Sequence, residues 1–148
     1  EVVFDNQVGN VHVNQSCPKY GDQVYREQNI DIAMYLEDGN VATIKDAEIQ
    51  ADPRTQFLLL EKHDILLQLG YQTEATMVRL LKEPKAFLIN ANNKGFCRVM
   101  LDKKSIDWFT ENLSTVKSNT NRCYLWQVLA DHVTMRLIRP SVYLDVVK

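Results

Sequence analysis

The sequence predicts a mostly β fold with appended α-helices: an antiparallel β-sandwich followed by about three short helices of an α-helical-hairpin domain. Three observations lead to this fold class. Apolar and polar residues alternate over several short runs before residue 102. Gly, Asn and Pro residues separate these runs. The apolar period then changes to three or four residues. We therefore place a β-sandwich domain at 1–102 and the first helices of a C-terminal helical domain at 103–148.

The first strands are predicted from alternation. Residues 11–15 alternate Val with polar residues, and residues 30–37 form a longer run of the same kind. The longer run predicts a half-buried strand with period two. Residues 37–40, Glu-Asp-Gly-Asn, predict a hairpin turn because Asp-Gly and Asn readily take positive φ. We expect residues 41–49 to form the returning strand.

Further strands are expected after the turn at 52–54, over residues 56–60, 65–71, 75–81, 86–90 and 96–101. The Asn-rich turn between the last two runs predicts an antiparallel hairpin over 86–101, with Gly95 or one of the asparagines at positive φ. Alternation places Arg98 on one face with Phe96 and Met100. We expect the Arg98 stem to be at least partly buried and its guanidinium to meet a carboxylate or several backbone carbonyls. An exposed edge arginine is the alternative.

Three helices are predicted after Asp102. Asp102 or Ser105 can cap the first helix, and residues 118–120 can cap the second. Pro140 fits the first turn of a third. The apolar stripes of the first two helices comprise Ile106, Phe109, Leu113, Val116, Leu125, Leu129 and Val133. Short helices leave apolar surface at Tyr143, Val146 and Val147, so we expect a larger architecture around them, or self-association.

Composition narrows the function classes. Seventeen Lys and Arg against nineteen Asp and Glu give a net charge of −2, which disfavours nucleic acid as a partner. No apolar run approaches the length needed to cross a membrane. The cysteines Cys17, Cys97 and Cys123 are odd in number and widely spaced, which indicates free thiols and a cytoplasmic location.

The residue types that carry chemistry form no recognisable pattern. None of His12, His63 and His132 has a second histidine four residues later, so a helical zinc pair is absent. His12 and Cys17 supply only two possible metal ligands, and we expect His12 at the surface and His132 at a solvent edge. The glycines stand singly, so no phosphate-binding loop is indicated. The aromatic residues with helical spacing predict helix packing, and they are Trp108, Phe109, Tyr124 and Trp126.

The segment 87–102 resembles a signature of the aminopeptidase N family of zinc metallopeptidases, which includes the puromycin-sensitive aminopeptidases. In that family a strand with Leu-x-Asn, a polar turn and Gly-aromatic-x-Arg-Val-x-x-Asp closes a β-sandwich before a helical domain. The matching residues here are Asn90, Gly95, Phe96, Arg98, Val99 and Asp102. Segments 104–113, 121–129 and 141–147 are similar to the first helices of that domain. Cys97 and Leu101 depart from the pattern, since relatives often carry tyrosine there.

The resemblance implies a noncatalytic C-terminal portion of such an enzyme. The family's His-Glu-x-x-His and Gly-x-Met-Glu-Asn motifs do not occur in this sequence. We therefore expect no catalytic residue, no metal and no cofactor in this chain, and zinc only in the parent protein. The implied partners are the parent's catalytic domain and remaining helical domain. Two alternatives stay open: a catalytically dead relative used as an assembly scaffold, and a stand-alone β-sandwich interaction module.

Overall fold

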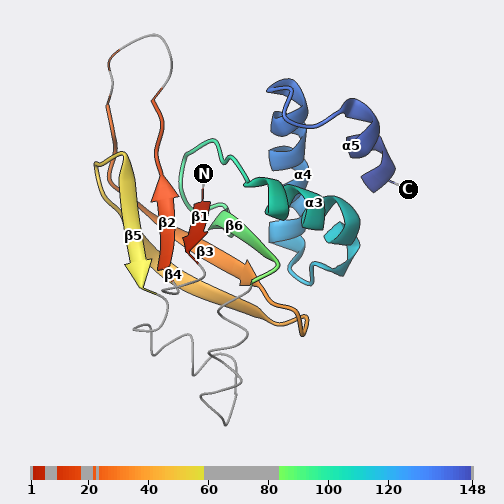
Figure 1. Ribbon diagram of the computed structural model, residues 1–148, viewed down its shortest axis with the longest axis horizontal. Helices are drawn as coiled ribbons and strands as arrows, with labels where there is room; N and C mark the ends of the chain where they lie inside the picture. Colours follow the sequence, from red (N-terminus) through yellow and green to blue (C-terminus); the bar gives the residue numbers. More distant parts are fainter. Residues whose placement is uncertain (1, 6–9, 18–21, 23, 59–83, 148) are drawn as a thin grey trace.

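The chain forms two antiparallel sheets and three α-helices, with the helices gathered on one side of the sheets (Figure 1). The computed structural model describes residues 2–5, 10–17, 22, 24–58 and 84–147. Strand and helix account for about equal numbers of these residues, so the helical share is larger than the mostly β prediction. The strands predicted at 65–71 and 75–81, together with His63, lie outside the described residues.

The first sheet has the strand order β1-β2-β5. Its strands are β1 (Val2–Asp5), β2 (Asn10–Asn14) and β5 (Arg54–Leu58). The alternation predicted β2 correctly, and Val11 and Val13 are buried. The surface position expected for His12 is wrong, because β2 is the central strand and its His12 side chain is also buried.

The second sheet has the order β4-β3-β6. Its strands are β3 (Gln28–Tyr35), β4 (Val41–Ile49) and β6 (Ala86–Ala91). The predicted β3–β4 hairpin is confirmed. Gly39 has φ +79°, and the Leu36 amide donates to the Asn40 carbonyl over 2.9 Å. The Asp38 carboxylate accepts the Asn40 amide over 3.0 Å, which explains the Asp-Gly-Asn signal.

The prediction that β3 is half-buried is wrong, since residues 30–36 are all buried. The second face is covered by a helix that the local alternation could not indicate. The Tyr35 ring lies 5.3 Å from the Trp108 ring and 5.1 Å from the Phe109 ring, measured between centroids. These contacts confirm the packing role expected for the helical aromatic residues.

The helices begin where the apolar period changes. They are α3 (Lys103–Asn112), a 3₁₀ turn (Leu113–Thr115), α4 (Asn119–Thr134) and α5 (Pro140–Val146). The predicted starts are confirmed: the Asp102 carboxylate caps α3, the Ser118 hydroxyl caps α4, and Pro140 opens α5. Within the described residues, no helix is long and apolar enough to cross a membrane.

The hairpin expected over 86–101 is only partly correct. The turn forms, but residues 96–101 lead to α3 without forming a strand and without pairing to β6. The Leu101 amide instead donates to Nε2 of His132 over 3.0 Å. His132 is therefore fully buried rather than at a solvent edge, and its Nδ1 lies 2.7 Å from the Val128 carbonyl. Because Nε2 accepts, Nδ1 carries the proton.

The end of the chain exposes apolar side chains, but only one of the three expected positions, Val147, is among them. Leu144 and Val147 are 61% and 62% exposed. Tyr143 and Val146 are instead partly buried against the core, and the Tyr143 ring lies 5.5 Å from the Trp126 ring. The sheets and helices thus share one buried cluster that includes residues of β2, β3, β4, β6, α3 and α4.

Candidate functional site

A cluster of polar side chains lies where the second sheet meets the helices. It begins with two irregularities on either side of Asp31 in the central strand β3. On β4, Lys45 and Asp46 both lie opposite Asp31, and on β6 Asn90 is an extra residue in the register. Asp46 and Asn90 have φ of 49° and 56°. These bulges open the sheet locally and let polar groups reach the Asp31 carboxylate.

Asp31 is only 1% exposed, and its carboxylate accepts three hydrogen bonds. Its Oδ1 accepts from the Asp46 amide and from Lys94 Nζ, each over 3.0 Å. Its Oδ2 accepts from Asn92 Nδ2 over 2.9 Å. Lys94 also contacts Asp46 Oδ1 over 3.0 Å, so one ammonium group joins two carboxylates. A buried charge is tolerated only with such partners.

These contacts determine the ionisation of the cluster. Burial alone would raise the pKa of Asp31, but the hydrogen bonds from Asp46, Asn92 and Lys94 outweigh it. The pKa therefore lies below the usual 3.8. Hydrogen bonds to Asp31 and then to Asp46 raise the pKa of Lys94 above 10.5. Both groups are thus held in their charged forms around neutral pH.

Asn90 organises the loop that follows β6. Its side chain is fully buried, and its Oδ1 accepts the Gly95 amide over 2.7 Å. Its Nδ2 donates to the Gly95 carbonyl over 2.8 Å and to the Tyr124 hydroxyl over 3.1 Å. The Asn90 carbonyl also accepts the Asn93 amide over 2.9 Å. One side chain therefore closes the loop 90–95, which we call the junction loop, and fastens it to α4.

A second connection to α4 runs through Asn121 in its first turn. Asn121 Oδ1 accepts the Asn92 backbone amide over 2.7 Å. The Asn121 side chain also acts on Tyr35 of β3, where it lowers the pKa of the hydroxyl. Burial has the larger effect and raises the pKa of Tyr35 to about 12, so the hydroxyl stays protonated. The junction loop is consequently held by β3 on one side and by α4 on the other.

The positive-φ prediction for this turn is confirmed at asparagines and not at Gly95. Asn90, Asn92 and Asn93 have φ of 56°, 62° and 53°. Gly95 is required for another reason: a Cβ there would lie 2.8 Å from Cγ2 of Ile30 and 3.3 Å from Asn90 Oδ1. The glycine allows the junction loop to approach β3 closely.

The remaining residues of the predicted motif lie outside the junction loop. Val99 is buried. Phe96 is fully exposed. Asp102 accepts the Ser105 amide over 3.0 Å, and the Ser105 hydroxyl in turn accepts the Phe87 amide of β6 over 2.9 Å. The burial expected for Arg98 is wrong, whereas the expected carboxylate partner is present. Its side chain is 66% exposed, and its Nε lies 3.9 Å from Asp131 Oδ2, because the face it shares with Phe96 is open to solvent.

The sequence interpretation missed the partners that make this site. Asp31 was assigned to a solvent face by alternation, and Tyr124 was given only a packing role. No local signal distinguishes Asn92, Lys94 or Asn121 from ordinary turn and cap residues, because their partners are distant in sequence. A charged residue inside a long apolar strand was the one usable sign that a buried polar contact was present.

The cluster is suited to holding segments in place. Each oxygen of the Asp31 carboxylate already accepts from the chain, and Asn90 uses both ends of its amide. Among the residues that the structure describes, no three His, Cys, Asp or Glu side chains converge as a metal site. No family model and no curated protein matches the chain.

The close approach at Gly95 gives a stability prediction. Gly95→Ala should lower the free energy of unfolding by about 1–3 kcal/mol, because the new methyl group overlaps Cγ2 of Ile30. Urea denaturation followed by circular dichroism measures the change. In an Ile30→Ala background, which removes that atom, Gly95→Ala should cost clearly less. An equal cost in both backgrounds would show that the contact is not responsible.

The Asp31 carboxylate gives a pH prediction. Its lowered pKa contributes stability that is fully present above the unfolded value, about 3.8, and is lost as pH falls through the folded value. Asp31→Asn should destabilise by about 1–3 kcal/mol at pH 7, since Lys94 and Asn92 lose a charged acceptor. Urea unfolding between pH 7 and pH 2.5 should show the two proteins converging at the acid end. A difference that is constant with pH would contradict this role for the charge.

Proposed function

We propose that the chain is a noncatalytic structural portion of an aminopeptidase N-like zinc metallopeptidase, whose parent protein removes N-terminal amino acids from peptides. In this proposal the two sheets belong to a β-sandwich, and α3 to α5 open a C-terminal helical domain. The observation that carries the proposal is the junction loop. Two of the residues on which the family resemblance rests, Asn90 and Gly95, form the hydrogen bonds that hold this loop closed. Asp102, another of these residues, starts the helices.

A structural portion must hold its two parts in a fixed relation, and the contacts of this junction suit that role. Three separate polar links connect sheet and helices in the described residues. Asn90 binds Tyr124, Phe87 binds Ser105, and Asn121 binds Asn92. Each link is at least partly buried and therefore specifies orientation as well as contributing stability.

The catalytic residues and the zinc ion of the proposed enzyme would lie in other parts of the parent protein. Its catalytic domain and the rest of its helical domain are the proposed partners, and zinc would be bound in the catalytic domain. The exposed apolar side chains of Leu144 and Val147 are suited to contact further helices. We place the parent in the cytoplasm, since Cys17, Cys97 and Cys123 are all free thiols.

The proposal is tested by identifying the protein from which this chain comes. An antibody raised against the 148-residue chain should detect, in extracts of the source organism, a protein far larger than 17.1 kDa. The immunoprecipitate should hydrolyse fluorogenic aminoacyl amides, and a zinc chelator should abolish that activity. Its coding sequence should contain His-Glu-x-x-His upstream of this segment.

Other results would redirect the assignment. A large protein without that motif and without hydrolysis would indicate a catalytically dead scaffold. A single species near 17 kDa, stable and monomeric when purified, would instead favour a stand-alone interaction module. Either result would contradict the proposed parentage with an active enzyme.

A further inference from the structure

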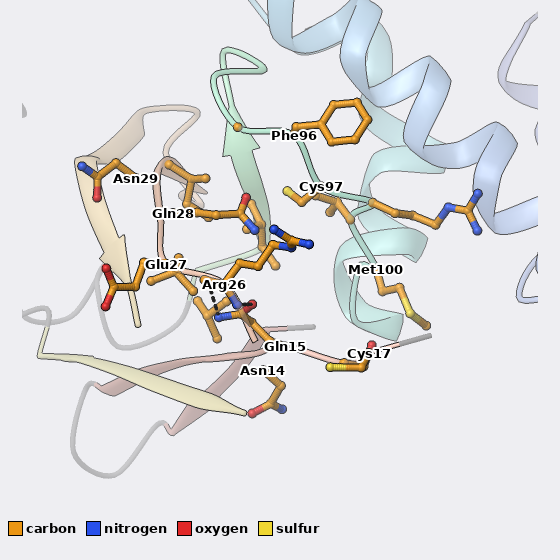
Figure 2. Close-up of a pocket in the computed structure, with 18 of the residues that line it drawn as sticks. Asn14, Gln15, Cys17, Arg26, Glu27, Gln28, Asn29, Phe96, Cys97 and Met100 are labelled. Carbon is orange, nitrogen blue, oxygen red and sulfur yellow. Dashed lines mark hydrogen bonds between the residues drawn. The ribbon is translucent and has the colours of Figure 1, made fainter. Parts of the chain in front are cut away.

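A cavity of about 1050 Å³ lies between the end of β2, the segment that leads into β3, and the stretch that precedes α3 (Figure 2). Its walls come from residues 13–17, 24, 26–30 and 95–100, with Ile49, Ile89 and Met135 contributing apolar side chains. This volume is near the upper end of the range of about 300–1000 Å³ that is typical of ligand pockets. We call this cavity the strand groove.

One wall of the strand groove is an unpaired strand. Residues 96–100 form no helix, turn or bend, and their burial alternates as in a strand, with Cys97 and Val99 the more buried. Within the described part of the chain their backbone makes no hydrogen bond. Pairing resumes only at Leu101, whose amide binds His132. An extended stretch with free N–H and C=O groups is a template for another strand. Five residues present about 17 Å of such edge at roughly 3.3 Å per residue.

The opposite wall carries an acceptor without a donor. Oε1 of Gln28 is buried and has no hydrogen-bond partner among the described residues. It lies 3.3 Å from the position that a Cβ on Gly95 would take, beside the start of the unpaired stretch. A buried amide oxygen without a partner is unfavourable, so a ligand N–H that reached it would gain binding energy.

The charge of the strand groove favours an acidic ligand. Figure 2 shows the Arg26 side chain extending into the cavity, whereas Glu27 points away from it. In the part of the chain that the structure describes, the Arg26 guanidinium has no carboxylate partner. Arg98 on the other wall is also largely exposed. Arg98 is paired with Asp131, so a carboxylate in the cavity would meet the unpaired guanidinium of Arg26.

We propose that the strand groove binds an extended peptide that carries acidic side chains. The peptide backbone pairs with residues 96–100, one of its N–H groups donates to Gln28 Oε1, and a Glu or Asp side chain binds Arg26. Apolar side chains on its other face contact Ile49, Ile89 and Met135. This inference goes beyond the structural role proposed above and does not depend on the parentage of the chain.

Fluorescence anisotropy with the purified 148-residue chain tests the proposal. The probe is a fluorescein-labelled hexapeptide, Val-Glu-Val-Glu-Val-Thr, and it should bind saturably. Arg26→Glu should weaken binding at least tenfold, because a charge pair becomes a repulsion. Arg54→Glu is the matched control, since Arg54 is exposed on β5 and does not line the strand groove, and it should change affinity less than twofold. Circular dichroism verifies that both variants fold.

Two further measurements separate strand pairing from simple charge attraction. A probe N-methylated at alternate amides keeps its charges but loses its donors, and it should bind at least tenfold more weakly. Hydrogen exchange of the amides of residues 96–100 should slow several-fold when the unmethylated probe is bound. Equal binding of the methylated probe, or equal weakening by Arg26→Glu and Arg54→Glu, would overturn the proposal. Concentration-dependent protection of 96–100 without peptide would also overturn it, by identifying a second copy as the occupant.

Discussion

The need to satisfy one buried carboxylate shapes the centre of this structure. Asp31 lies in the middle of the central strand β3, where a flat ladder would leave its charge without donors. Bulges on both neighbouring strands supply the space, and Asp46, Asn92 and Lys94 supply the donors. The bulge on β6 also sets the backbone of Asn90 at positive φ, and this directs the chain toward α4. The charge on the sheet and the position of the helices are therefore linked through a few residues.

The polar links and the apolar core have different roles. The buried cluster that spans both sheets and two helices provides most of the stabilisation, because apolar burial is the dominant favourable contribution to folding. Such a core permits several relative placements of a helix on a sheet. The hydrogen bonds from Asn90 to Tyr124 and from Asn92 to Asn121 are directional and restrict that choice. His132 adds a similar restriction where Leu101 passes α4.

Local patterns predicted the elements well and their surroundings poorly. Alternation, Asp-Gly turns and capping residues located β2, β3, β4 and the starts of all three described helices, since these depend on neighbours in sequence. The same alternation placed Asp31 on the exposed face of a half-buried strand, and His132 of the second helix was expected at a solvent edge. Both residues are buried, because nothing local indicates that a second layer covers them. Gly95 was singled out for its φ, yet the structure requires it for the contact with Ile30. Its correct reason lies 65 residues away in the chain.

Native-state hydrogen exchange on the wild-type chain and on Asn90→Ala tests most directly whether the junction couples sheet and helices. Amides in the middle of β3 and of α4 should exchange with the same opening free energy in the wild type, because both are released in one event. Asn90→Ala removes the side chain that binds Gly95 and Tyr124, so α4 should then open at a lower free energy than β3. Independent opening of α4 in the wild-type chain, with β3 still protected, would contradict the account.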